Sequence, residues 1–361
     1  MTATAHPPVA RRISARDETF IDYLRGLSIL RVVLAHLGLS WIFPPYSEFV
    51  MALLPILFFV SGAVSFFSFR RASSSGFFLL RRALMLTIPV YVLAVIGGAV
   101  RAVMAGSVES FEWIYVLSWL LLNPGAHMMP FELGQIWFLR ALLIITFLAI
   151  PVFVAARRSD HALLVPVLLS TILVTLQLFH DIADSFYRGG FNFYQPLANM
   201  GFFFFGAWYF AQRARGVDRV SWLITAGLLG LSVATGSVVH PDVGLADHTY
   251  SPNLYYVAAS YFAICLAVRL QPVIEIAVGR FTWVERGTLF FSRHAFSVYL
   301  LHSFVLIVSE RSFGLVDVMG DPIRAATKVG FVVVGSMVAA IPLTWLSRLV
   351  RARALALCRV G

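Results

Sequence analysis

The sequence predicts an all-α, polytopic integral membrane protein, and three observations carry this prediction. Hydrophobic residues make up 59% of the 361 residues, charged residues make up only 13%, and the mean hydropathy is +0.82. Soluble domains typically carry about 25% charged residues. In addition, apolar runs of helix length recur along the chain, and arginines gather between these runs. The lipid bilayer is therefore the first expected partner.

The apolar runs predict ten transmembrane helices, because about 20 mostly apolar residues span the hydrocarbon core. Prolines and arginine clusters mark where most of the runs end. A further run at 113–123 is too short to span and predicts a re-entrant or interfacial helix, and Pro89 predicts a kink in the third helix. The expected helices are at about 19–42, 48–68, 83–105, 135–156, 162–180, 197–212, 220–239, 253–270, 294–309 and 326–347.

The chain reads as one membrane domain at 19–349, without a repeat at fixed spacing. Residues 1–18 are polar and rich in arginine, so we expect a disordered cytoplasmic tail, and residues 350–361 form a second, basic tail. The first apolar run lacks a small-residue cleavage site and is long, so we expect a retained helix and no signal peptide.

The basic residues predict the orientation of the chain. With ten spans, 20 of the 28 Lys and Arg residues fall on the side of the two termini and only five on the opposite side. By the positive-inside rule both termini are cytoplasmic, and we expect a multi-pass protein of the plasma membrane. The same rule explains the net charge of +10, so we expect no nucleic acid partner. Two cysteines are too few for a disulfide framework, and we expect no bound metal or cofactor.

The first helix carries polar residues at membrane depth, where each central arginine costs about 2.5–3.5 kcal/mol. Arg25 and His36 are eleven residues apart, which corresponds to about three turns and a rise of about 16 Å, so they share one helix face. Arg31 lies far round the helix from Arg25 and should meet another wall of the bundle. Ionisable residues in such positions are functional candidates.

Four motifs in the chain resemble the membrane-bound acyltransferase family 3. The first helix of that family carries an arginine, ten further residues and then a histidine. Arg25 and His36 have the same spacing here. The family often has two arginines three apart before a proline in the third helix, whereas here Arg81-Arg82 are followed by Met85 and Leu86. The four motifs are Asp22-Tyr-Leu-Arg25-Gly26 with His36, Phe58-Phe-Val-Ser-Gly62, Ile136-Trp-Phe-Leu139 and Ser297-Val-Tyr-Leu-Leu-His302.

The resemblance implies transfer of an acyl group from acyl-CoA, as donor substrate, to a hydroxyl of a saccharide, a lipid-linked glycan or a glycosylated metabolite. His36 would act as general base, since a histidine with its unperturbed pKa of about 6.5 can take the proton of the attacking hydroxyl. Arg25 would complete the catalytic pair and hold the donor, and Arg81 and Arg82 would meet the donor phosphates. The expected supporting residues are Asp22, Trp137, Arg140, Tyr299 and His302.

Each of these residues also has a purely structural interpretation. His36 and His302 could be hydrogen-bonding residues within the bundle, and Arg25 could extend to the cytoplasmic interface. Trp137 is more typical of packing than of substrate contact. Arg140 needs a partner inside the membrane, and Glu132 lies two turns before it.

Two further classes of function remain open at the level of sequence. A glycan or lipid transporter or flippase is the main alternative, but inverted repeats are not visible and acidic residues are scarce within the spans. A scaffolding subunit of a biosynthetic complex is the other, and polar residues within the first helix argue against it.

Overall fold

The computed structural model describes residues 13–37, 53–104, 122, 136–180, 182–188, 191–239, 245–249, 251–316, 318 and 321–360. Within these residues the chain is helical apart from short connections and a two-residue β-hairpin, in which β1 (Tyr187–Arg188) pairs antiparallel with β2 (Phe191–Asn192). The main helices are α1 (Ala15–His36), α3 (Pro55–Arg71), α4 (Ser75–Met104), α6 (Ile136–Ala155), α7 (Leu164–Leu176), α8 (Tyr194–Arg213), α9 (Trp222–Val239), α10 (Leu254–Arg269), α11 (Gln271–Gly279), α12 (Thr282–Arg293), α13 (Ala295–Phe313) and α14 (Pro322–Val360).

Each of the ten expected helices has a counterpart in the structure, which confirms the all-α class. Three helices are long and apolar enough to cross a membrane, and five if two bent helix pairs each count as one span. The helices α3, α7 and α10 are short for a span, and α1 carries polar residues along its length. Ten spans therefore stay a prediction, whereas a helical membrane protein is supported.

Several boundaries differ from those expected. The helix α1 begins at Ala15, inside the predicted tail, because the Ser14 hydroxyl accepts from the Asp17 backbone N–H and Asp17 and Glu18 favour the first turn. The last helix continues to Val360, through the predicted basic tail. The expected loop after α10 is also mostly helical, since it forms α11 and α12. The segment at 113–123, apart from buried Leu122, and residues 1–12 lie outside the described part of the chain.

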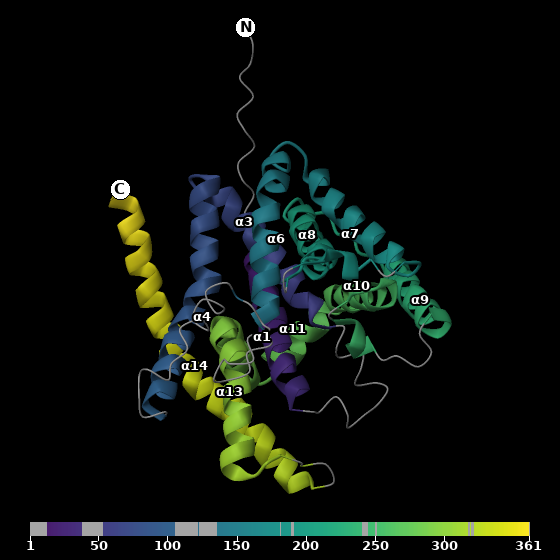
Figure 1. Cartoon of the computed structure of the whole chain (residues 1–361). Coiled ribbons are helices and arrows are strands. Elements are labelled where there is room, and N and C mark those ends of the chain that lie inside the picture. Colours follow the sequence, from purple (N-terminus) through teal and green to yellow (C-terminus); the bar gives the residue numbers. More distant parts are fainter. Residues whose placement is uncertain are drawn as a thin grey trace.

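The helices form two groups around α1 and α6 (Figure 1). The group of α7, α8, α9 and α10 lies on one side, and α4, α13 and α14 lie on the other, where α14 crosses α4. Aromatic side chains fill the space between the groups. Phe153 of α6, for example, contacts the rings of Phe66, Phe69, Phe78 and Phe203 at centroid distances of 5.3–6.3 Å.

The close crossing of α3 and α8 explains one of the sequence motifs. A side chain at Gly62 would collide with the backbone of Phe203, and one at Gly206 would collide with the backbone of Phe59. The glycine of the Phe58–Gly62 motif therefore lets two helices touch by their backbones. Its neighbour Ser61 is turned to a cavity described below.

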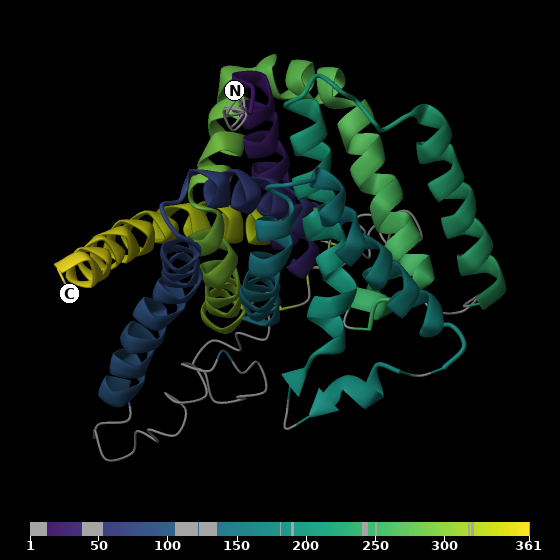
Figure 2. The same ribbon diagram turned by 90° about the horizontal axis from the view of Figure 1, so that it is seen from above.

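Polar contacts join distant segments at one end of the molecule. Arg213 at the end of α8 pairs with Asp17 of α1 at 2.9 Å, and Arg16 pairs with Glu275 of α11 at 2.8 Å. Arg215 pairs with Asp160 at 2.7 Å, which adds the connection between α6 and α7. Figure 2 shows the start of α1 beside the light green segment that follows α10. We call these three pairs the ion-pair cluster. They bring together segments that the sequence assigns to one side of the membrane.

Candidate active site

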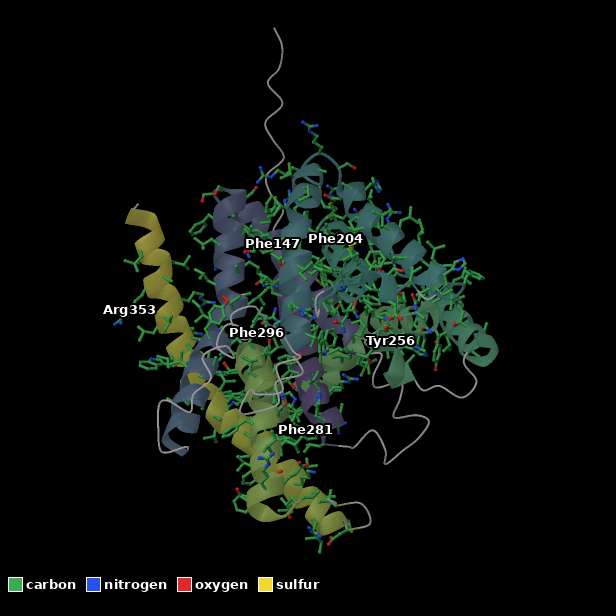
Figure 3. The ribbon with its side chains drawn as sticks, viewed as in Figure 1. Phe147, Phe204, Tyr256, Phe281, Phe296 and Arg353 are labelled. Atoms are coloured by element: carbon green, nitrogen blue, oxygen red, sulfur yellow. The ribbon has the colours of Figure 1, made fainter. Side chains whose placement is uncertain are left out.

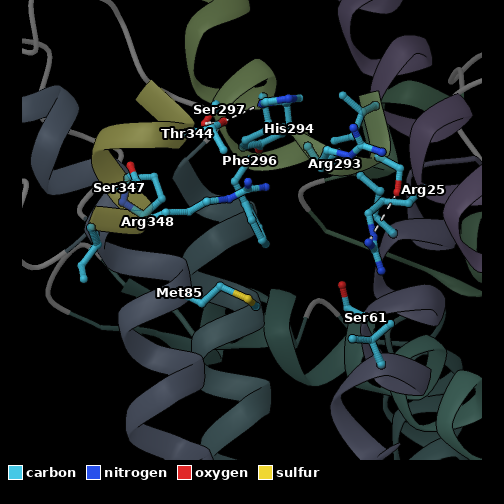
Figure 4. Close-up of a pocket in the computed structure, with 18 of the residues that line it drawn as sticks. Arg25, Ser61, Met85, Arg293, His294, Phe296, Ser297, Thr344, Ser347 and Arg348 are labelled. Atoms are coloured by element: carbon cyan, nitrogen blue, oxygen red, sulfur yellow. Dashed lines mark hydrogen bonds between the residues drawn. The ribbon is translucent and has the colours of Figure 1, made fainter. Parts of the chain in front are cut away.

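A cavity of about 290 Å³ lies where α1, α4, α13 and α14 meet, and it is lined by arginines (Figure 4). This volume is near the lower end of the range of about 300–1,000 Å³ for small-molecule sites. We call it the arginine cavity. Its arginines come from four helices and are Arg25, Arg82, Arg293, Arg348 and Arg351.

Arg25 is held at the cavity by a small polar network. Its Nη1 lies 3.2 Å from Asp22 Oδ1, one turn earlier in α1, and 3.5 Å from Ser292 Oγ of α12. The Ser292 hydroxyl in turn donates to Asp22 Oδ1 at 2.8 Å. The Asp22-Tyr-Leu-Arg25 motif thus fixes its arginine against a second helix. Gly26, which follows, lets α1 approach the backbone of Thr288 in α12.

Helix α14 contributes one polar face to the cavity. Its residues Thr344, Ser347, Arg348 and Arg351 follow an i, i+3, i+4, i+7 pattern and all line the cavity. In Figure 4, Arg348 extends from α14 toward Phe296, and Arg25 approaches from the opposite side. From the sequence, Arg348 and Arg351 were expected only as part of the basic C-terminal end of the chain. The spacing of these four residues on one face was the signal that could have identified them.

A bend of 93° between α12 and α13 shapes the next part of the wall. His294 lies at this bend, and its Nδ1 is 2.9 Å from Thr344 Oγ1, while the Thr344 hydroxyl donates to Ser297 Oγ at 2.7 Å. Hydrogen bonds thus link His294, Thr344 and Ser297 across the bend and α14. The sequence analysis did not identify His294 or Thr344 as site residues.

The cavity is rich in positive charge and poor in negative charge. Among the described residues, Arg25 is the one cavity arginine with an ion pair to a carboxylate. Arg82 is 7% exposed, and its Nε has no hydrogen-bond partner in the part of the chain that the structure describes. A buried guanidinium normally has a partner. The arrangement therefore suits an anionic ligand.

Two histidines face each other at the other end of α1. The ring centroids of His36 and His302 are 4.9 Å apart at an angle of 59°. His36 Nδ1 is 2.8 Å from the Val32 carbonyl oxygen, and His302 Nδ1 is 3.3 Å from that of Val298. Since a carbonyl oxygen only accepts, Nδ1 is the donor in each neutral ring, and each Nε2 carries the lone pair. His302 is fully buried, whereas His36 is accessible.

Aromatic side chains connect the arginine cavity to the histidine pair. Tyr299 and Phe138 both line the cavity, with ring centroids 5.5 Å apart. The Tyr299 ring also lies 6.0 Å from the His302 ring. Motifs from α1, α6 and α13 therefore meet along one path, although they are up to 266 residues apart in the chain (His36 to His302).

The remaining predicted residues separate into two groups. Arg82 lines the cavity, whereas its neighbour Arg81 is exposed and is not among the lining residues. Arg31 interacts electrostatically with Tyr256 of α10, on another wall of the bundle as expected. Trp137 and Arg140 are each 7% exposed and lie outside the cavity lining, and Trp137 packs edge-on against Phe138. Glu132, the predicted partner of Arg140, lies outside the described residues.

The fold and the site define an all-helical membrane protein that has an arginine-lined cavity and, at the other end of α1, a pair of facing histidines. The chain belongs to the acyltransferase 3 family, because the family model, described as an acyltransferase domain, matches residues 18–347. This match covers every motif on which the resemblance rested. No curated protein and no solved structure gives a significant match to the chain.

Proposed function

We propose that the protein is a membrane O-acyltransferase that transfers an acyl group from acyl-CoA to a hydroxyl of a saccharide, glycan, lipid-linked saccharide or glycosylated metabolite. Membership of the acyltransferase 3 family supports acyl transfer as the reaction. The observation that carries the choice of donor is the arginine cavity, where five guanidinium groups surround one space with a single paired carboxylate. Coenzyme A brings phosphate groups that such a space would attract.

The donor phosphates bind in the arginine cavity. Arginine forks form charge-assisted and often bidentate hydrogen bonds with phosphate oxygens. Met85 lines the cavity one turn after Arg82, in the region where the family often has its second arginine. Arg348 and Arg351 of α14 line the same cavity and provide positive charge from the other side. We therefore assign the donor site to Arg25, Arg82, Arg348 and Arg351. Arg81 is not included, because it is exposed and does not line the cavity.

The pantetheine arm of the donor extends along Tyr299 and Phe138 and brings the thioester to the histidine pair. There the lone pair on His36 Nε2 accepts the proton of the acceptor hydroxyl as its oxygen attacks the thioester carbonyl carbon. The carbon–sulfur bond then breaks, and the CoA thiolate leaves and takes the proton that His36 accepted. His302 is buried, its ring lies 4.9 Å from the His36 ring at a tilt of 59°, and it positions that ring. Arg25, about 16 Å along the helix from His36, acts on the donor.

The proposal includes the orientation of the chain, with both termini cytoplasmic, in the plasma membrane. The ion-pair cluster supports it, because it joins the start of α1 to the ends of α8 and to α11, all of which the basic residues assign to the cytoplasmic side. Reporter fusions after residues 75, 158, 216 and 361 test this orientation. All four should report a cytoplasmic location.

The chemistry is tested by comparing His36→Gln with wild type in membranes. Radiolabelled acetyl-CoA is added together with glycan and lipid extracts from the source cells, and incorporation of label is measured. Proton transfer by a positioned base contributes about 100- to 10,000-fold, so His36→Gln should lose transfer to that extent. The control is His161→Gln, an exposed histidine before α7. Equal labelling by wild type and His36→Gln would refute the role of His36. Release of CoA by wild type distinguishes the enzyme from a transporter, which would release none.

A further inference from the structure

We propose that an open groove at the start of α12 binds the headgroup of an anionic phospholipid from the surrounding membrane. Arg280, Phe281, Trp283, Arg286 and Met337 line this groove, which is separate from the arginine cavity. We call it the α12 groove. The inference does not depend on the proposed activity, and lipid binding can be measured without a substrate.

The groove exposes aromatic side chains that a water-facing surface would disfavour. Trp283 is 76% exposed and Phe281 is 50% exposed, with ring centroids 6.3 Å apart. Phe281 is labelled in the lower half of Figure 3. Tryptophan side chains are enriched where the headgroups of a bilayer meet its hydrocarbon core. The pair of rings therefore indicates contact with that boundary.

Two arginines flank the rings, and the nearby acidic residues are occupied elsewhere. Glu285 accepts a hydrogen bond from Tyr23 Oη at 2.8 Å, on the side of α12 that packs against α1. Glu275 is bound by Arg16 and Gln271. Within the described ranges, neither Arg280 nor Arg286 forms an ion pair, and the Arg280 guanidinium lies 5.5 Å from the centre of the Phe281 ring. Both cations are thus available for a phosphate.

The groove is connected to the end of the molecule that carries the ion-pair cluster. It follows α11 directly, and α11 is tied to the ion-pair cluster through Arg16–Glu275 and through the hydrogen bond of Arg213 to Gln271. The sequence assigns this end of the molecule to the cytoplasmic leaflet, which is rich in anionic lipids. Each arginine near such a surface contributes about 1 kcal/mol of attraction.

An apolar surface for the acyl chains begins where the groove ends. Met337 of α14 closes the groove, and beside it Val334, Val338 and Ile341 form one exposed face of that helix, at spacings of four and three residues. The helix is long and apolar enough to cross a membrane. A phospholipid can therefore place its phosphate between Arg280 and Arg286 and its chains along α14.

The test measures binding of phosphatidylglycerol to the purified full-length protein in a neutral detergent, with phosphatidylcholine as the comparison lipid. Native mass spectrometry should show tighter binding of phosphatidylglycerol to wild type. The double variant Arg280→Gln/Arg286→Gln should weaken that binding by about 30-fold, which corresponds to about 1 kcal/mol for each arginine. The matched control Arg158→Gln/Arg219→Gln removes the same charge from exposed sites elsewhere and should bind as wild type. Equal losses in both double variants would refute the site.

A second measurement does not depend on charge variants. Brominated phosphatidylglycerol should quench part of the tryptophan fluorescence of wild type, and that part should disappear in Trp283→Phe. Brominated phosphatidylcholine should quench this component less. Equal quenching by the two lipids would mean a surface that contacts the membrane without recognising headgroups, and no quenching of Trp283 would point to a protein partner on the groove. Either result would overturn the proposal.

Discussion

The ion-pair cluster and the arginine cavity use the same residue type in opposite ways. In the cluster, Arg16, Arg213 and Arg215 each face a carboxylate, at 2.7–2.9 Å. In the cavity, five arginines share one space, and among the described residues only Arg25 has a carboxylate partner, at 3.2 Å. In the cluster each of these arginines is neutralised by a carboxylate, whereas the cavity has positive charge that an added anion can neutralise.

The difference separates structural arginines from functional ones. A paired arginine joins two segments and contributes to the free energy of unfolding, and removing it leaves a buried carboxylate alone. An arginine without a partner in a cavity contributes little to folding and adds a field that a ligand can use. Substitutions in the two regions should therefore change different measured quantities.

The largest expected effect is on stability and comes from Arg213→Gln in the cluster. It leaves Asp17, whose side chain is 6% exposed, without its cation, and it removes the hydrogen bond to Gln271. Breaking a buried ion pair costs about 3 kcal/mol or more. Thermal unfolding in detergent should show a clearly lower midpoint, with an unchanged KM for acyl-CoA in the protein that stays folded. The control is Arg219→Gln, exposed and close in sequence. A changed KM in Arg213→Gln would mean that the cluster also affects donor binding, which contradicts the separation of structural from donor-binding arginines.

The next effect is on donor binding and comes from Arg348→Gln/Arg351→Gln in the cavity. Hydrogen bonds to charged groups contribute about 1.5–3 kcal/mol each, so the KM for acyl-CoA should rise by at least about tenfold. The unfolding midpoint should stay near that of wild type. Arg353→Gln is the matched control, since Arg353 is on the same helix, is exposed and points away from the bundle (Figure 3). If Arg353→Gln raised KM equally, the effect would reflect the net charge of the helix.

The smallest expected effect concerns Arg25, which lines the cavity and also has a carboxylate partner, as the arginines of the cluster do. Asp22→Asn removes the carboxylate that pairs with Arg25 while keeping an acceptor for Ser292 and Arg25. The field in the cavity becomes more positive, so KM for acyl-CoA should fall about two- to fivefold, in line with the modest energy of a partly exposed pair. Turnover should fall as well, because Arg25 is less firmly placed. A rise in KM would mean that Asp22 orients Arg25 for the donor more than it offsets its charge.

The sequence by itself determined the helical class, the order of the helices and the family. Each of these depends on local patterns, namely apolar runs, arginines between them and four short motifs. The pairing of Arg25 with Asp22 also follows from local spacing, because residues three apart share a helix face. The helix ends were less well determined. Helix α14 continues through its basic residues, since arginine favours helix and no proline or glycine occurs between Arg348 and Val360.

Only the tertiary structure decided which polar residues meet. The sequence places Arg81 and Arg82 side by side, but successive residues on a helix point in different directions, and one turns to the cavity while the other turns outward. Arg348 and His302 reach the site because α13 and α14 pack against α1 and α4, which depends on side-chain shape across hundreds of residues. Such long-range packing has no signature in local periodicity, so the donor site could not be completed from the motifs alone.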